Sequence, residues 1–168
     1  MIKAFATLVL LGAAGSAGAQ EQSVSPADTA EIAASVASCL AVTTAAGPDA
    51  EALAAQGWQK GTAMDPRGKP LATPFSVYGR KGGKTMIMIA PMSKGRGICA
   101  VTARIDGTDA AKGVVDALSA ELKAKPAKVE QSEIYWFAGR KVVQLTSTGD
   151  RSKPSVRISV MQLPEKSK

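Results

Sequence analysis

Residues 79–85 of this 168-residue chain, Gly-Arg-Lys-Gly-Gly-Lys-Thr, end in the same triplet as a phosphate-binding loop. Such a loop needs four residues between its first glycine and the Gly-Lys pair, whereas only three intervene here. An apolar strand also follows Thr85, where the loop requires a helix. We therefore predict a basic hairpin turn that does not hydrolyse nucleotides. Its cations Arg80, Lys81 and Lys84 are a candidate anion-binding site, and the alternative is that they are merely solvated.

An aromatic run, Tyr135-Trp136-Phe137, lies close to Arg140. Consecutive side chains of a strand point to opposite faces, so we expect part of this run to be exposed. An exposed aromatic ring beside a cation suits contact with a sugar or a protein. Tyr135 and Trp136 are therefore candidate contact residues.

Methionines at 86, 88 and 92 raise the possibility of a copper site, because thioethers are ligands of Cu(I). Both faces of the strand that holds Met86 and Met88 are apolar, which is typical of a strand covered on both sides. The chain contains no histidine that would complete a coordination shell. We expect these side chains to pack in the core, and we predict no metal site and no cofactor.

The absence of histidine also restricts catalysis, because it excludes triads and zinc sites built on imidazole. The two cysteines are expected to be oxidised and therefore unable to act as nucleophiles. A Ser-Lys dyad or a pair of carboxylates remains. Ser93-Lys94 is expected in a turn and does not suit the dyad, and the candidate carboxylates are Asp65, Asp106, Asp109 and Asp150. Each has a simpler explanation in a turn or at the start of a helix, so no catalytic residue is predicted.

The N-terminus has the three parts of a secretory signal peptide: Lys3, an apolar run over residues 4–14, and small residues before a cleavage point after Ala19. The apolar run is shorter than the roughly 20 residues that span a bilayer. We expect residues 1–19 to be removed and residues 20–168 to form one soluble domain, without a transmembrane span, in the periplasm or outside the cell.

The chain has two cysteines, Cys39 and Cys99. Oxidising conditions outside the cytoplasm let a disulfide persist, and two cysteines allow one intramolecular pairing. Closing a loop of about 60 residues removes on the order of 4 kcal/mol of unfolded-state entropy. We predict a structural disulfide between Cys39 and Cys99.

The elements that position these residues follow from the spacing of apolar side chains. A helical pattern begins with Ser25 as its N-cap and carries Cys39 on its buried face. A short helix ends before Gly57 with Trp58 in the core, and a second long helix follows Thr108 as N-cap. Glycine and proline predict a surface loop over residues 60–74. Alternating apolar residues predict strands at 75–79, 85–90, 97–105, 134–138, 142–148 and 156–163.

This order predicts an α+β fold whose antiparallel sheet is built from two three-stranded meanders. The N-terminal helix is disulfide-linked to the third strand, and the second long helix lies between the meanders. The two halves share no residue pattern, so the question of an internal repeat stays open.

The charge balance favours anionic partners, because 21 Lys and Arg residues against 14 Asp and Glu residues give a net charge of +7. Nucleic acid is not expected as a partner of an exported protein. Our leading interpretation is a non-enzymatic binding module for an anionic envelope partner, which is a protein, a glycan or a lipid. The alternatives are a histidine-free hydrolase of an envelope polymer that uses paired carboxylates, and a purely structural envelope protein. None of the motifs assigns a family or an oligomeric state.

Overall fold

The computed structural model describes residues 25–65, 67–92 and 96–164, so the predicted signal peptide lies outside the described residues. The helices are α1 (Thr29–Val42), α2 (Ala50–Ala55) and α3 (Ala110–Glu121). A short ribbon joins α1 to α2 and consists of β1 (Thr43–Thr44) and β2 (Gly47–Pro48). The strands of the main sheet are β3 (Gln59–Gly61), β4 (Ser76–Gly79), β5 (Thr85–Pro91), β6 (Gly97–Arg104), β7 (Lys128–Glu130), β8 (Glu133–Ala138), β9 (Lys141–Gly149) and β10 (Pro154–Gln162).

The main sheet is eight-stranded and antiparallel throughout, in the order β3-β4-β5-β6-β10-β9-β8-β7. Each half of the chain contributes one meander, and the two meanders meet where β6 pairs with β10, with Val101 opposite Ile158. The predicted α+β fold is therefore confirmed, with one difference. Each meander has a fourth strand at its outer edge, β3 or β7, which has three residues and is too short to show alternation.

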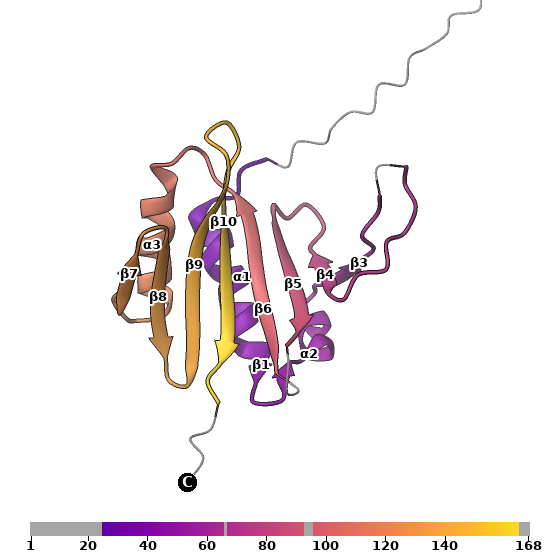
Figure 1. Ribbon diagram of the computed structural model, residues 1–168, viewed down its shortest axis with the longest axis horizontal. Coiled ribbons are helices and arrows are strands. Elements are labelled where there is room, and N and C mark those ends of the chain that lie inside the picture. Colours follow the sequence, from indigo (N-terminus) through magenta and orange to yellow (C-terminus); the bar gives the residue numbers. More distant parts are fainter. Residues whose placement is uncertain (1–24, 66, 93–95, 165–168) are drawn as a thin grey trace, which may run out of the picture.

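Helices α1 and α3 pack side by side on one face of the sheet, behind it in the view of Figure 1. The core lies between them and the sheet, and includes Ile32 and Val36 of α1 and Ile87, Val101 and Ile158 of the sheet. The predicted disulfide is confirmed: Cys39 of α1 is bonded to Cys99 of β6, with the two Cα atoms 5.6 Å apart. Both cysteines are fully buried, so the bond fixes α1 against the centre of the sheet.

Helix α1 begins later than the sequence predicts. The N-cap is Asp28, whose side chain accepts a hydrogen bond from the backbone N–H of Glu31 at 2.7 Å, and the predicted N-cap Ser25 lies outside the helix. The reason is that Ala27 donates its N–H to the carbonyl of Arg104 at 2.9 Å, which holds the preceding residues against the end of β6. The short helix α2 ends as predicted, since Gly57 follows it with φ +84°.

The sheet face opposite the helices, called the open face below, is uncovered by any helix of the described residues (Figure 1). This corrects the prediction that the strand of Met86 and Met88 is covered on both sides. Ile87 is fully buried under α1, whereas Met86 is 44% exposed and Met88 is half-buried on the open face. Apolar residues on both faces of a strand do not show how many layers cover it.

In each half of the chain a long helix precedes a meander of four strands, and in the first half the β1–β2 ribbon and α2 lie between them. The centre of this arrangement is the antiparallel pair β6 and β10, with α1 and α3 in contact behind it. No helix in the described ranges has the length and apolar character to cross a membrane.

Candidate functional site

The register of the strands arranges the open-face side chains in rows that cross the sheet. The first row is apolar and consists of Phe137, Val142, Met161, Ile98 and Ala90. The second row mixes polar and apolar side chains and consists of Tyr135, Gln144, Ser159, Ala100, Met88 and Val77. The third row carries charge and consists of Glu133, Thr146, Arg157, Thr102, Met86 and Gly79. The open face is therefore apolar near one end and charged toward the other.

A groove of about 540 Å³ lies at the charged end of the open face, over strands β4 to β6 and the start of β10. Its lining includes the apolar Val77 and Met86, the hydroxyl-bearing Thr102 and Ser155, and the cationic Lys84, Arg104 and Lys153. None of the described residues that line it is acidic. The combination of an apolar floor, hydroxyl groups and cations suits a ligand that joins an anionic group to an apolar one.

The basic turn between β4 and β5 contributes only part of its predicted anion site to this groove. Lys84 lines the groove, and Lys81 is exposed in the turn without lining it. Arg80 lies elsewhere: its guanidinium carbon is 4.5 Å from the centre of the Trp58 ring, and its Nη2 donates a hydrogen bond to the carbonyl of Gln56 at 2.9 Å. The three predicted cations therefore lie in three different surroundings.

The backbone amides of this turn bind a carboxylate of the protein itself. Oε1 of Glu31, on α1, accepts hydrogen bonds from the N–H of Lys84 at 2.6 Å and of Thr85 at 3.1 Å. The hydroxyl of Thr85 is also 2.8 Å from that of Ser35 on α1. The turn resembles a phosphate loop because it presents successive amides, and an internal carboxylate already occupies those amides.

The predicted contact aromatics lie on opposite faces of β8. Tyr135 is half-buried on the open face, where its hydroxyl donates to the Glu133 carboxylate and accepts from Nε2 of Gln144 at 3.2 Å. The hydrogen bond to Glu133 is the main cause of a raised pKa of Tyr135. Phe137, which was not predicted as a contact residue, is 53% exposed on the same face.

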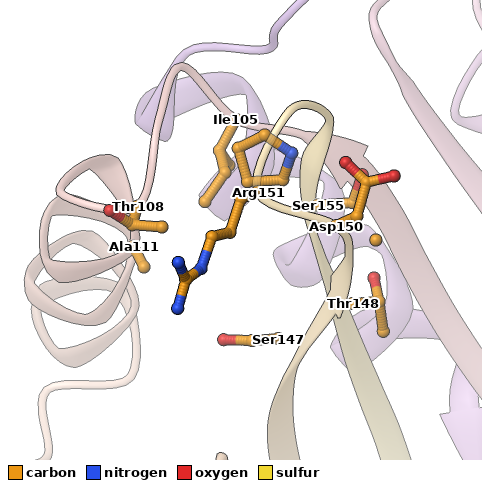
Figure 2. Close-up of a pocket in the computed structure, with 10 residues that line it drawn as sticks. Ile105, Thr108, Ala111, Ser147, Thr148, Asp150, Arg151 and Ser155 are labelled. Atoms are coloured by element: carbon orange, nitrogen blue, oxygen red, sulfur yellow. The ribbon is translucent and has the colours of Figure 1, made fainter.

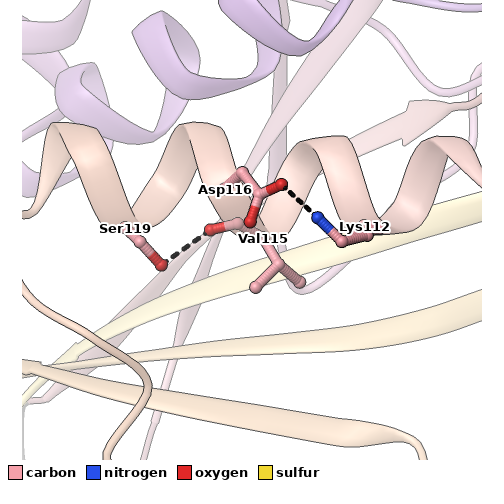
Figure 3. A network of polar contacts seen from close by, with 4 residues as sticks. All are labelled: Lys112, Val115, Asp116 and Ser119. Atoms are coloured by element: carbon pink, nitrogen blue, oxygen red, sulfur yellow. Dashed lines mark hydrogen bonds and ion pairs between the residues drawn. The ribbon is translucent and has the colours of Figure 1, made fainter.

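Trp136 is not a contact residue, which corrects the prediction. It is fully buried under α3, where its Nε1 donates to the hydroxyl of Ser119 at 3.2 Å. The Ser119 hydroxyl in turn donates to the carbonyl of Val115 at 2.7 Å, as Figure 3 shows beside the exposed ion pair of Lys112 and Asp116. The alternation of strand side chains puts Trp136 in the core because both of its neighbours lie on the open face.

Two of the four carboxylates considered for catalysis, Asp65 and Asp150, bind groups of their own loops, and Asp109 is the N-cap residue of α3 without a side-chain capping bond. Asp65 accepts hydrogen bonds from the N–H groups of Arg67 and Lys69, both at 2.8 Å. Asp150 accepts from the hydroxyl of Ser152 and from nearby backbone amides, and these bonds, led by that of the Ser152 side chain, lower its pKa.

A pocket of about 290 Å³ beside Asp150 lies between α3 and the loop that joins β9 to β10. Figure 2 shows Arg151 reaching across this pocket between Thr108 and Ser147, while Asp150 points to the opposite side. Asp150 is the one acidic residue among those that line the pocket. A pair of carboxylates therefore does not form there.

Two carboxylates do meet at the β7–β8 hairpin, where Glu130 lies opposite Glu133. Glu130 forms an ion pair with Lys128 at 2.5 Å, and Glu133 accepts the hydrogen bond from Tyr135. Both acids thus have partners within the hairpin. Among the described residues, no group of three or more His, Cys, Asp or Glu side chains is placed to hold a metal ion.

The groove on the open face could not be predicted from the sequence, because its lining residues are far apart along the chain. Lys84, Arg104 and Lys153 lie in three different connections or strand ends and meet only when β6 pairs with β10. Comparison with protein-family models, curated proteins and solved structures found no match to this chain.

Proposed function

We propose that this chain is an exported, non-enzymatic binding module that holds an amphipathic anion of the cell envelope, of the lipid class, in the groove of the open face. The observation that carries the proposal is the lining of the groove, in which Lys84, Arg104 and Lys153 surround an apolar floor with no acidic residue among the described lining residues.

Charge supports an anionic ligand. Cations from both halves of the chain lie around the groove, and the whole chain carries a net charge of +7. Clefts lined by one sign of charge concentrate ions of the opposite sign and raise their association rate. A phosphate or carboxylate would also find the hydroxyl groups of Thr102 and Ser155 as hydrogen-bond donors.

The apolar floor supports a ligand that also has an apolar part. Met86 is 44% exposed in the groove, and Val77, which also lines the groove, lies diagonally across from it on the neighbouring strand. Covering such surface contributes about 25 cal/mol for each Å² of apolar area removed from water. A simple inorganic anion would leave this surface wet, so a lipid headgroup with the start of its acyl chains fits better.

Export supports the envelope as the source of the ligand. The buried Cys39–Cys99 disulfide is compatible with a compartment outside the cytoplasm, where disulfides persist. The N-terminal residues 1–19 have the pattern of a secretory signal peptide, which also supports export of the chain.

The experiment is a calorimetric titration of residues 20–168 with dihexanoyl phosphatidylglycerol and with dihexanoyl phosphatidylcholine, which differ in net charge but share their chains. We expect the anionic lipid to bind about tenfold more tightly, and added salt to reduce this difference. Lys84→Gln should weaken binding of the anionic lipid about three- to tenfold, because it removes one cation from the groove.

Lys81→Gln is the matched control, because it makes the same charge change in the same turn at a residue that does not line the groove. It should leave the affinity nearly unchanged. Equal weakening by both substitutions would show that only the net charge attracts the lipid. Equal binding of both lipids by the unaltered protein would rule the proposed ligand out.

A further inference from the structure

Three neighbouring strands of the open face carry a pattern that is complementary to itself. Strand β9 lies between β8 and β10, and each row of the open face crosses all three strands. Read from β8 to β10, the rows are Phe137-Val142-Met161, Tyr135-Gln144-Ser159 and Glu133-Thr146-Arg157. The first row is apolar throughout, and the third has an acid on one side of β9 and a base on the other.

Phe137 is 53% exposed, and the side chain of Arg157 is exposed with no hydrogen bond or ion pair to any residue that the structure describes. Glu133 is half-buried and accepts the hydroxyl of Tyr135, and its carboxylate has acceptor sites left for a partner. Burying a large aromatic side chain against apolar surface stabilises an interface, and aromatic and arginine side chains are both enriched in interfaces.

We infer that a second copy of this chain covers the open face, with the twofold axis of the dimer parallel to β9 and close to Thr146. Rotation about such an axis keeps each row at its own level and exchanges the β8 side with the β10 side. Phe137 then faces the partner's Met161, and Glu133 faces the partner's Arg157. Because a twofold interface is the same on both copies, each of these contacts forms twice.

The positions of Glu133 and Arg157 favour a twofold axis along β9 over the other possible axes. An axis along β8 would place Glu133 against the partner's Glu133, and an axis along β10 would place Arg157 against the partner's Arg157. An axis across the strands at the middle row would place the apolar row on the charged row, and one at the apolar row would leave the charged rows of both copies without an opposing row. Like charges in contact destabilise an interface, whereas the β9 axis gives apolar contact and two ion pairs together.

The area that each copy covers determines how tightly the proposed dimer should associate. About five strands at 4.8 Å spacing and about six residues at 3.4 Å each give roughly 500 Å² on each copy. This is close to the lower limit of about 1,000 Å² in total for a specific interface, so the dimer should be weak and dependent on concentration. Sheets that pack face to face lie about 10 Å apart, which leaves room for the side chains of both copies.

The proposed dimer leaves most of the proposed lipid groove open and overlaps it only at its edge, where Thr102, Arg104 and Ser155 lie on β6 and β10. With the axis along β9, the partner's sheet ends with its β7 opposite β6, so β3, β4 and β5 stay uncovered. Most of the groove is built on these uncovered strands and the turn before β5. Dimer formation and lipid binding can therefore fail separately.

Sedimentation equilibrium of residues 20–168, from about 1 μM to about 1 mM, tests the inference because this range brackets the affinity of small interfaces. The unaltered protein should dimerise within the range. Arg157→Glu and Glu133→Arg should each raise the dimer dissociation constant about 30-fold or more, since each replaces two attractive pairs by two repulsive ones.

An equimolar mixture of the two variants decides between this dimer and any other. In the mixed dimer one ion pair is native and the other is reversed, so the mixture should dimerise nearly as well as the unaltered protein. Arg67→Glu, in the exposed loop before β4, is the matched control and should change nothing. Far-ultraviolet circular dichroism of each variant checks folding.

A protein that stays monomeric over the whole range overturns the inference. It is equally overturned by a dimer that Arg157→Glu leaves intact, or by a mixture that does not recover. If Glu133→Arg fails to fold, Val142→Glu replaces it: this substitution places two acids next to the axis and should abolish the dimer, and an intact dimer would contradict the inference.

Discussion

At the scale of single residues, Glu31 connects the first helix to the turn that resembled a phosphate loop. Its carboxylate accepts the N–H groups of Lys84 and Thr85. Hydrogen bonds to a charged group are about twice as strong as neutral ones, and these two also fix the position from which Lys84 reaches the groove.

Glu31→Ala should therefore lower the free energy of unfolding by about 1–2 kcal/mol, since it leaves two amides of the turn without a protein partner. Urea unfolding measures this change. Glu51→Ala is the control, because Glu51 lies at the corresponding place in the first turn of α2 and is exposed. Equal losses in both variants would mean that the contacts of Glu31 with the turn are not stabilising.

Tyr135 gives a second prediction at this scale, which concerns pH. The hydrogen bond to Glu133 is the main cause of its raised pKa. The bond stabilises the fold fully below the unfolded-state pKa of about 10, and its contribution is lost as the pH rises through the higher folded-state pKa.

Ultraviolet absorbance of tyrosinate follows this titration, and Tyr135→Phe identifies which part of the signal belongs to Tyr135. Glu133→Gln should lower the pKa of Tyr135, because it removes the negative charge that favours the protonated phenol. A titration curve unchanged by Glu133→Gln would contradict this assignment.

At the scale of elements, the disulfide between α1 and β6 closes a loop of 60 residues that contains α2 and the first three strands of the sheet. Replacing both cysteines by serine should lower the free energy of unfolding by on the order of 3–4 kcal/mol, because the unfolded chain gains conformational freedom. Urea unfolding should give the same midpoint for this variant and for the reduced unaltered protein. A variant as stable as the oxidised protein would show that packing alone holds α1 in place.

The elements were predicted to the extent that local pattern defines them. The six longer strands, β4 to β6 and β8 to β10, show alternation between turns, and α2 lies between an aspartate N-cap and Gly57, so these elements could be predicted. Strands β3 and β7 could not, because three residues on a sheet edge show no period. The predicted start of α1 was wrong by one turn. The helix begins later because Ala27 is hydrogen-bonded to Arg104 at the end of β6, a contact between residues that are distant in sequence.

The candidate site was less predictable than the fold. The turn supplied Lys84 to the groove, but Arg80 turned to Trp58, a contact with α2 and its following residues that no spacing in the sequence indicates. The position of Trp136 followed from which face of β8 the helices cover. Alternation in the sequence assigns side chains to the two faces of a strand, but it does not show which face is exposed to solvent.

At the scale of the whole molecule, the chain consists of two halves with one plan, joined along β6 and β10. The helices α1 and α3 cover one face of the sheet, and the proposed lipid groove and dimer surface both lie on the open face. The groove proposed to bind lipid lies mainly over the strands of the first half, whereas the proposed dimer surface is centred on β9 in the second half.

The central place of β10 also determines the order in which the molecule can assemble. It is the last strand along the described chain, yet it pairs with β6 on one side and β9 on the other. Until it is added, β6 and β9 have unpaired edges of the kind that aggregate, and the contacts that close the sheet are distant in sequence. A chain that emerges from its N-terminus first cannot complete its sheet before residues 154–162 are free, so the sheet can close only after nearly the whole chain has emerged.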